Sequence, residues 1–375
     1  MMAEYAAAER ARPSASQRDP ELLRADFERW LTGRQPGAAV ASATVPSSTG
    51  MSSETILVDA GWDGEPHRLV VRIAPQPRSR PVFPHYDMRC QFLTLRRLRT
   101  QLNRPAVPGV LWCENDPAPM GAPFFVMTRI DGEIPPDVMP YTFGSWLSDA
   151  SAADRRRLQH ATVEQLARVH AAAAADFGFL DRRRPGETAL HAHVRHTEEY
   201  YEWIGADVPL IERGFDWLRE HWPNESDPVL SWGDARIGNI IYRDFTPVAL
   251  LDWEMASLGP RELDLGWMIF LHRFFQDLAN AAGLPGLPDF LRRDDVADAY
   301  ADITGHRPAD LDFYTAYAAL RHAIIMVRIQ LRAIAFGQGE LPDDRDSMIL
   351  HRDTLVRMLD GTYWTALDSA MTGGA

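Results

Sequence analysis

The sequence contains no lysine, and all 39 of its basic residues are arginine. A Schiff-base lysine, a pyridoxal-phosphate lysine and the Gly-Lys-Ser/Thr phosphate loop all need an amine that this chain lacks, so these chemistries are excluded. Because the absence extends over the whole chain, it is typical of a compositional bias. An arginine at any one site can therefore stand in for lysine, but it keeps its proton and grips phosphate through two hydrogen bonds.

Cysteine and long apolar runs are also scarce. Cys90 and Cys113 are the only two cysteines. They form no CxxC pair and no metal-like spacing with histidine, so we expect neither a disulfide framework nor a zinc site. No run of about 18 apolar residues occurs, and the first twenty residues lack the apolar core of a secretory signal. The sequence therefore predicts a cytoplasmic protein with no membrane partner.

The charge balance favours small-molecule ligands. The chain has 375 residues, of which 46% are hydrophobic, a composition typical of a globular protein with room for two lobes. Its formal net charge of -13 argues against nucleic acid or an anionic membrane surface as the main partner.

The pattern of apolar residues divides the chain into four parts. Residues 1–37 form a tail followed by a helix that begins near Asp19. Residues 38–128 alternate apolar and polar positions and predict a small antiparallel sheet lobe that includes one helix. Residues 129–140, rich in Pro and Gly, predict a hinge and linker. Residues 141–375 show mainly helical spacing, so the fold class that we expect is α+β.

Two strand-like runs in residues 230–267 carry polar residues at their ends. In "SWGDARIGNIIY" Asp234 lies in a tight loop and Asn239 ends it, whereas Asp252 ends the run "VALLD". If the strands joined by "YRDFTP" form a hairpin, Asn239 comes close to Asp252. One carboxylate and one amide oxygen, completed by water and substrate phosphates, suit Mg²⁺. Asp234 is then placed to accept a proton from a substrate hydroxyl.

Each of these residues taken alone could be ordinary turn chemistry, because Asp and Asn favour loops and caps. The joint pattern resembles the catalytic core of the aminoglycoside phosphotransferase-like family of small-molecule kinases, whose two-lobe fold is similar to that of protein kinases. The matching segments are "WGDARIGN", "DWE" and "GPRELDL", and the resemblance extends over residues 38–335. It implies that Asp234 is the catalytic base, that Asn239 and Asp252 hold Mg²⁺, and that Asp264 braces the catalytic loop.

Two positions depart from the family pattern. Trp232 stands where the family usually has histidine, and Gln91 stands where a helical Glu would pair with the phosphate-binding cation. We expect Trp232, Gln91, Asp264 and Glu254, the acid of "DWE", to support the site without contacting the reacting groups.

The resemblance also predicts a nucleotide site in the first lobe. The segment "VPSSTGMSSETILV" corresponds to the loop that covers the phosphates, with Ser52 and Ser53 as the best matches, although a Ser/Gly-rich loop can be merely structural. Arg72 in "LVVRIAP" takes the position of the strand lysine that grips the phosphates, and an outward Arg on an exposed face is the alternative. The adenine is expected against the backbone at Met127, Thr128 and Ile130.

Residues 320–336 are expected to line the acceptor site, and they include no acid. Arg321, Arg328 and Arg332 are spaced by seven and four residues, which places them on one face of a helix. They could be solvated or paired with acids from elsewhere. Without carboxylates here, we expect a neutral or anionic acceptor and not a polycationic aminoglycoside. His170 has apolar helical neighbours and is interpreted as structural.

The sequence thus predicts a kinase that uses ATP and Mg²⁺ to phosphorylate a hydroxyl of a small molecule. Trp232 and Gln91 keep open a nucleotide-binding pseudokinase with a sensing or scaffold role. A metal-dependent hydrolase that needs no nucleotide is disfavoured by Arg72 and the serine-rich loop. The acceptor, the choice between ATP and GTP, and the oligomeric state stay open.

Overall fold

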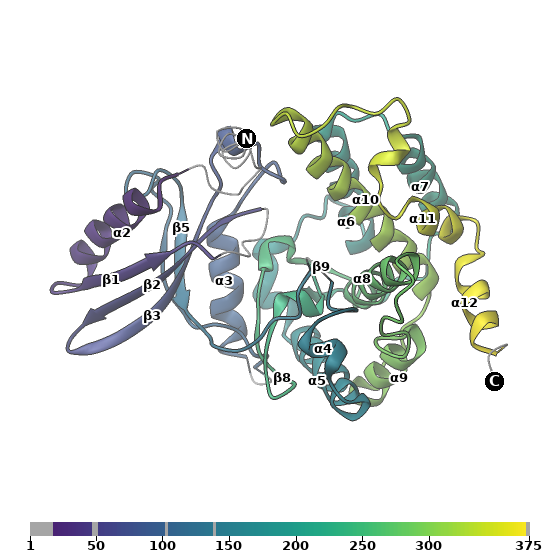
Figure 1. Cartoon of the computed structure of the whole chain (residues 1–375), viewed down its shortest axis with the longest axis horizontal. Coiled ribbons are helices and arrows are strands. Elements are labelled where there is room, and N and C mark those ends of the chain that lie inside the picture. Colours follow the sequence, from purple (N-terminus) through teal and green to yellow (C-terminus); the bar gives the residue numbers. More distant parts are fainter. Residues whose placement is uncertain (1–17, 47–51, 102–103, 138–139, 373–375) are drawn as a thin grey trace. The chain divides into compact units, whose positions relative to one another are not determined.

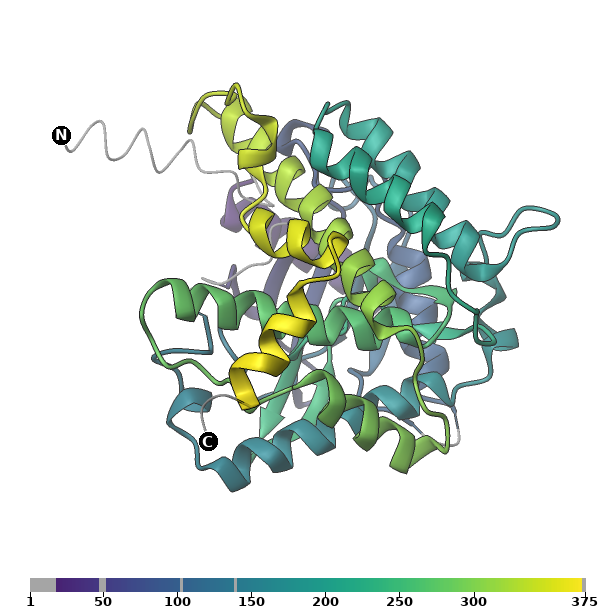
Figure 2. The ribbon, with the colours of Figure 1, turned by 90° about the vertical axis from the view of Figure 1, so that its right-hand side faces the viewer.

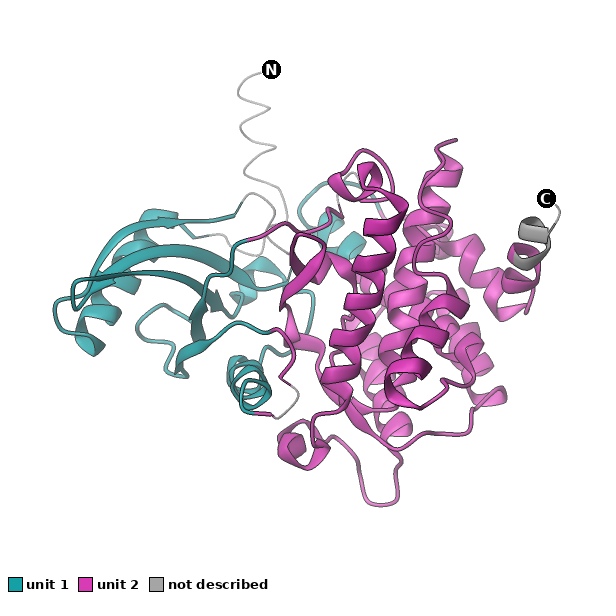
Figure 3. Cartoon of the chain, turned by 90° about the horizontal axis from the view of Figure 1, so that it is seen from below, with its two compact units in different colours: residues 1–100, 107–131, 329–340 teal, residues 101–106, 132–328, 341–375 magenta. Residues whose placement is uncertain are grey.

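The computed structural model describes residues 18–46, 52–101, 104–137 and 140–372, and these form two compact units (Figure 3). The first unit comprises residues 1–100, 107–131 and 329–340, and the second comprises residues 101–106, 132–328 and 341–375. One boundary, between residues 131 and 132, falls inside the segment that the sequence predicts as a hinge. No helix in the described part of the chain is long and apolar enough to cross a membrane.

The first unit is built on an antiparallel sheet of five strands in the order β1-β2-β3-β5-β4. Its elements are α2 (Pro20–Arg34), β1 (Ala39–Thr44), β2 (Glu54–Trp62), β3 (Glu65–Ile73), α3 (Met88–Leu98), β4 (Val110–Glu114) and β5 (Phe124–Thr128). Asp63 and Gly64 join β2 to β3, both with positive φ (54° and 79°), as a two-residue hairpin turn requires. This sheet and the helices of the second unit confirm the α+β class.

The sheet of the first unit has two distinct faces. Helix α2 lies against one of them (Figure 1), where Trp30 packs edge-on to Phe124 at 4.8 Å. Residues directly opposite each other on neighbouring strands point to the same face. Because Arg72 is paired with Phe125, and Phe124 points the other way, Arg72 lies on the face that α2 does not cover.

The second unit is mainly helical. Its helices are α4 (Trp146–Asp149), α5 (Ala152–His170), α6 (Ala189–Ile204), α7 (Pro209–Glu220), α8 (Glu262–Ala281), α9 (Arg293–Thr304), α11 (Arg352–Leu359) and α12 (Tyr363–Thr372). Helix α10 (Leu311–Ala335) belongs to this unit up to residue 328 and to the first unit from residue 329. Two pairs of short strands, β6 (Val229–Ser231) with β9 (Ser257–Gly259) and β7 (Ile240–Arg243) with β8 (Thr246–Leu250), complete it.

Helix α8 forms the centre of the second unit. It is buried on nearly all sides, as its mostly apolar sequence predicts. Figure 2 faces this unit and shows α10 beside α6 and α8. Strands β7 and β8 form the hairpin that the sequence predicts, and Asp244 and Phe245 at its tip both have positive φ. The hairpin and the first turn of α8 position the candidate site.

Two histidines are buried together where α10 meets α11. The Nδ1 atoms of His322 and His351 lie 3.4 Å apart, and His351 Nε2 donates to the Ala319 carbonyl at 2.9 Å. The rings of Phe270 and Phe274 pack on both imidazoles. Burial lowers the pKa of His351 to about 4, and burial also lowers the pKa of His322 well below its usual range. Both imidazoles are therefore neutral in the folded protein at pH 7.

This burial predicts a specific loss of stability in mild acid. The unfolded chain takes up a proton at His351 near pH 6.5, whereas the folded chain does so only near pH 4, so stability falls as the pH drops from 7 to 5. His351→Gln should reduce that loss in unfolding free energy by up to about 2 kcal/mol. Urea unfolding at the two pH values measures it, with the exposed His221→Gln as the control. An unchanged pH dependence in His351→Gln would contradict the prediction.

Candidate functional site

The loop between β6 and β7 is held by one buried carboxylate. Asp264, in the first turn of α8, accepts hydrogen bonds from Ser231 Oγ (2.9 Å), Trp232 N (2.7 Å) and Gly233 N (2.8 Å). Its Oδ2 also lies 3.0 Å from His170 Nε2. The Asp264 side chain is only 1% exposed, so these contacts replace the water that the carboxylate gives up.

Gly233 has no tolerable substitute in this loop. Its φ is +88°, and a Cβ there would lie 2.1 Å from the Met255 carbonyl oxygen. Both the backbone conformation and the close approach therefore require glycine.

Asp234, the predicted base, is oriented by three side chains. Trp267 Nε1 donates to Oδ1 at 2.7 Å and Asn239 Nδ2 donates to Oδ2 at 2.6 Å. Arg236 Nε lies 3.2 Å from both oxygens, and its guanidinium also pairs with Asp137. Burial lowers the pKa of Arg236, but Asp234 and Asp137 outweigh that effect and raise it.

Arg236 and Trp267 are not among the residues that the sequence pattern predicts. Arg236 lies inside the "WGDARIGN" segment itself. Trp267 follows Asp264 by three residues on α8, so both side chains point from the same face of that helix toward the loop. This i, i+3 spacing was the signal available in the sequence.

Asn239 and Asp252 occupy neighbouring backbone positions. Leu251 N donates to the Asn239 carbonyl at 2.8 Å, which places Asp252 directly after the residue that pairs with Asn239. Asn239 is 6% exposed, and because its Nδ2 is bonded to Asp234, its Oδ1 is the atom left to bind a cation. Asp252 adopts a left-handed conformation (φ 56°, ψ 68°), which is uncommon for a residue other than glycine and frequent at functional sites.

The donor set fits a magnesium ion that is shared with a substrate. No group of three or more His, Cys, Asp or Glu side chains in the described ranges could hold a metal alone. An amide oxygen and one carboxylate are oxygen ligands of the kind that Mg²⁺ takes, and phosphates and water fill the remaining positions. Glu254 follows in the short helix η4 (Trp253–Met255) and is half-buried.

Trp232 joins the loop between β6 and β7 to the end of β8. Its backbone N–H is bonded to Asp264, and its Nε1 donates to the Leu251 carbonyl at 2.8 Å. The ring is 1% exposed and lies 5.7 Å from the ring of Trp253. The side chain therefore fills the space between the loop and the Asp252 turn.

The predicted nucleotide residues all lie in the first unit. Residues 47–51 of the predicted phosphate loop lie outside the described residues. Ser53 is 2% exposed, and its buried Oγ has no hydrogen-bond partner among the residues that the structure describes. Gln91 is buried on α3. The N–H of Thr128 donates to the Gly109 carbonyl at 2.7 Å, and its Oγ1 accepts from Gly109 N at 2.9 Å, so the backbone N–H is not free for an adenine ring.

The three arginines of α10 have different surroundings. Arg321 lies over the rings of Trp267 (4.7 Å) and Tyr317 (5.8 Å), next to the catalytic loop. Arg328 lies over Trp203 at 4.6 Å. Arg332 is buried in the first unit, where its Nε donates to the Ser79 carbonyl at 3.0 Å. Arg321 contacts the carbonyl of Gly233, next to Asp234, whereas Arg332 binds a residue of the first unit, so the helical spacing alone does not define a common site.

Parts of two longer curated proteins resemble this chain in sequence. The chain is 24% identical over 310 residues to a protein of Arabidopsis thaliana named as a probable acyl-CoA dehydrogenase, and it covers 35% of that protein while 76% of the chain is matched. It covers 22% of a second relative, acyl-CoA dehydrogenase family member 10 of Mus musculus. The chain thus spans about a third or less of the length of these curated relatives.

Solved structures share the fold over nearly the whole chain. A candidate aminoglycoside phosphotransferase of Ralstonia eutropha JMP134 has a TM-score of 0.63 and 18% identity, covering 91% of this chain and 98% of that one. A thermostable mutant aminoglycoside phosphotransferase, solved with ADP and hygromycin B, has a TM-score of 0.55 and 15% identity, covering 89% and 98%. These likenesses confirm the expected kinase-like fold.

The family itself is shown by its sequence model. The model described as the phosphotransferase enzyme family matches residues 44–294, more than half of the chain. The match includes the Asp264-held loop and both proposed metal ligands. The family confirms the expected enzyme class, a small-molecule kinase. This chain belongs to the phosphotransferase enzyme family.

Proposed function

We propose that the protein transfers the γ-phosphoryl group of ATP to a hydroxyl group of a small molecule, with Mg²⁺ bound. The observation that carries this proposal is the orientation of Asp234. Its two oxygens are fixed by Trp267 and Asn239, beside the turn that presents Asp252.

In the proposed reaction Asp234 accepts the proton of the acceptor hydroxyl. The hydroxyl oxygen forms a bond to the γ-phosphorus, the bond from that phosphorus to the β,γ-bridging oxygen breaks, and ADP leaves. Such transfers depend mainly on positioning and charge neutralisation, with a modest contribution from the base. Fixing the carboxylate through an indole N–H and an amide N–H limits its rotation and keeps it aimed at one acceptor position.

Mg²⁺ would be held by Asn239 Oδ1 and the Asp252 carboxylate, and when bound it neutralises the phosphate charge. On the phosphate side, the buried Ser53 hydroxyl is a ready donor for an oxygen. Arg72 is the proposed cation for the α- and β-phosphates. Met127, Thr128 and Ile130 are proposed to border the adenine, with the Thr128 N–H already in use by Gly109.

The roles of the chain segments follow from these residues and belong to the proposal. Residues 38–128 would bind nucleotide, residues 129–140 would act as the hinge, and residues 141–375 would supply catalysis and acceptor binding. A cytoplasmic location, inferred from the scarce cysteines, is proposed with them.

The alternative of a nucleotide-binding pseudokinase rests on Trp232 and Gln91. The hydrogen bonds of Trp232 support an intact loop, which favours activity. ATP turnover by the purified protein separates the two functions, because a pseudokinase would bind nucleotide without releasing ADP.

Asp234→Asn tests the base directly. The amide keeps the shape of the side chain but accepts a proton poorly, so kcat should fall by about 10²–10⁴-fold while Mg·ATP binding stays within about threefold. Steady-state ADP release and calorimetry measure the two quantities. The exposed Asp216→Asn serves as the control. Wild-type turnover in Asp234→Asn would remove Asp234 from this role.

Asp252 is tested by a pair of variants, because its left-handed backbone tolerates Asn better than Ala. Both Asp252→Asn and Asp252→Ala should weaken Mg·ATP binding by more than about tenfold, since each removes a charged oxygen ligand. Neither should change the affinity for ATP in EDTA. Titration calorimetry with and without Mg²⁺ checks this, and an unchanged Mg·ATP affinity in both variants would count against the metal site.

The acceptor is proposed to be neutral or anionic, because α10 presents arginine and no acid from residue 320 to residue 335. We expect kanamycin, a polycation, to be phosphorylated with a kcat/KM below about 10⁴ M⁻¹s⁻¹. An ADP-release panel of hydroxylated metabolites and antibiotics gives the comparison. The panel includes hydroxylated acyl thioesters, because the curated relatives are named acyl-CoA dehydrogenases. A higher value for kanamycin would overturn this expectation.

A further inference from the structure

Arg321 is a buried cation without an anionic partner in the described part of the chain. Arg321 is 6% exposed. Within the described residues it makes one hydrogen bond, a long one of 3.4 Å from Nη2 to the Gly233 carbonyl. It also lies over two aromatic faces, Trp267 and Tyr317, and Asp264 and Asp234 act on it electrostatically from beyond ion-pair distance. Burial lowers the pKa of Arg321, although the guanidinium stays charged. A buried charge of this kind needs a counter-ion.

The nearest carboxylates are already engaged by other groups. Asp264 accepts from the loop backbone and Ser231, and Asp234 accepts from Trp267 and Asn239 and pairs with Arg236. Among the described residues, neither carboxylate forms an ion pair within 4.0 Å of the Arg321 guanidinium.

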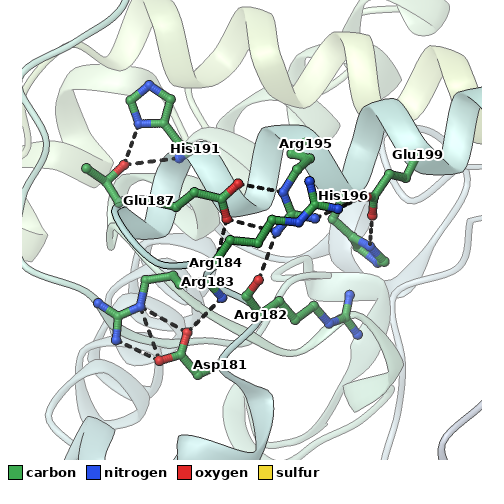
Figure 4. A network of polar contacts seen from close by, with 10 residues as sticks. Asp181, Arg182, Arg183, Arg184, Glu187, His191, Arg195, His196 and Glu199 are labelled. Carbon is green, nitrogen blue, oxygen red and sulfur yellow. Dashed lines mark hydrogen bonds and ion pairs between the residues drawn. The ribbon is translucent and has the colours of Figure 1, made fainter.

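The acids of residues 181–199 are engaged as well. Figure 4 shows this network, in which Arg195 binds Glu187 (2.7 Å) and Glu199 (2.9 Å), and Arg184 also binds Glu199 (2.9 Å). Glu198 pairs with Arg219 at 2.6 Å. Arginines therefore neutralise these side chains locally.

The surroundings of His193 show the sign of the remaining charge. His193 Nδ1 contacts the Tyr317 hydroxyl at 2.7 Å, on the ring that faces Arg321. Burial lowers the pKa of His193 well below its usual range, and Arg321, His196 and Arg182 lower it further. All three of these groups are cationic or can become so. Apart from Arg321, the charged groups that act on His193 are thus cations and not carboxylates.

Arg321 is one side chain away from Asp234. The indole of Trp267 donates to Asp234 Oδ1 at 2.7 Å, and the same ring lies 4.7 Å from the Arg321 guanidinium carbon. In addition, the carbonyl that Arg321 contacts belongs to Gly233, the residue before Asp234. Arg321 and Asp234 are therefore connected through one indole ring and through the Gly233 peptide.

We propose that Arg321 binds an oxyanion of the acceptor, a carboxylate or a phosphate, and so selects hydroxylated anions as substrates. The inference rests on the proposed function. The acceptor hydroxyl takes the γ-phosphoryl group from ATP, ADP leaves, the hydroxyl proton passes to Asp234, and the product keeps its original anionic group. A guanidinium suits this role because its N–H groups can bind two oxygens of one anion.

The test uses paired acceptors that differ only in charge. The probes are 2-, 3- and 4-hydroxybutyrate with their amides, and glycerol 3-phosphate with glycerol. Each is assayed for ADP release with ATP. Each is also assayed for a shift in Tm in the presence of Mg²⁺ and a non-hydrolysable ATP analogue. The variants are Arg321→Gln and Arg321→Lys. Arg357→Gln is the matched control, because Arg357 also lies over a tyrosine ring, Tyr363 at 5.3 Å, but is exposed on α11.

We expect at least one anion to exceed its neutral partner by roughly 10- to 100-fold in kcat/KM, or to be alone in raising Tm. Arg321→Gln should abolish that preference through KM, Arg321→Lys should keep part of it, and Arg357→Gln should leave it unchanged. If the carboxylates respond, the oxyanion is a carboxylate, and if glycerol 3-phosphate responds, it is a phosphate.

The proposal is overturned if no anion is preferred in either readout, or if a folded Arg321→Gln variant keeps the preference. A second result would also overturn it. If Arg321→Gln lowers the rate of ATP hydrolysis measured in the absence of acceptor as strongly as it lowers turnover of the anion, Arg321 acts on the transferred phosphoryl group and not on the acceptor. The rate of ATP hydrolysis without acceptor in Asp234→Asn tests the proposed kinase function separately. A failure of the proposal for Arg321 can therefore be distinguished from a failure of the proposed function.

Discussion

The carboxylate of Asp264 is the interaction on which the rest of the site depends. It is placed in the first turn of α8, where the helix dipole favours a negative charge. From there it receives the backbone N–H groups of Trp232 and Gly233 and the hydroxyl of Ser231. Removing the carboxylate would leave these buried donors without an acceptor, which typically costs about 1–3 kcal/mol for each group. One side chain therefore sets the path of the loop that carries Asp234.

The same helix also orients Asp234, the proposed base. One turn after Asp264, Trp267 reaches Asp234, so α8 fixes both the backbone of the loop and the carboxylate that it presents. On the other side of the loop, Trp232 binds the Leu251 carbonyl, just before Asp252. Asp264 holds the loop through its backbone N–H groups, and the Trp232 indole finds its own acceptor in the Leu251 carbonyl, so the tryptophan side chain is accommodated without disturbing those bonds. This explains how a tryptophan fits where the family usually has histidine.

The sequence was sufficient for features that depend on local patterns. Residues close together in the chain predict the alternating strands, the hairpin of β7 and β8, and the helix start at Asp19. At that helix start, Asp19 Oδ1 accepts a hydrogen bond from Glu21 N. His170 was interpreted as structural, and it contacts Tyr300 and Asp264 in the core. The roles of Asp234, Asn239 and Asp252 rest on the family pattern and stay predictions.

Features that depend on distant contacts were not available from local patterns. The ion pair of Arg236 with Asp137 joins residues 99 positions apart, and no spacing rule predicts it. Helical spacing correctly puts Arg321, Arg328 and Arg332 on α10, but it does not say what packs against each one. Arg332 binds the carbonyl of Ser79, 253 positions away, whereas Arg321 packs on Trp267.

Trp267 also gives the site an optical and magnetic signal of its own. Its ring lies between a carboxylate at the indole N–H and a guanidinium over the face, so the local electric field acts on its absorption and emission. The chain contains 11 tryptophans, and comparison of the isotope-labelled protein with a Trp267→Phe variant would identify this indole N–H resonance among the others. Protonation of Asp234, or neutralisation of Arg321 by a bound anion, would then be visible at a single nucleus without following turnover.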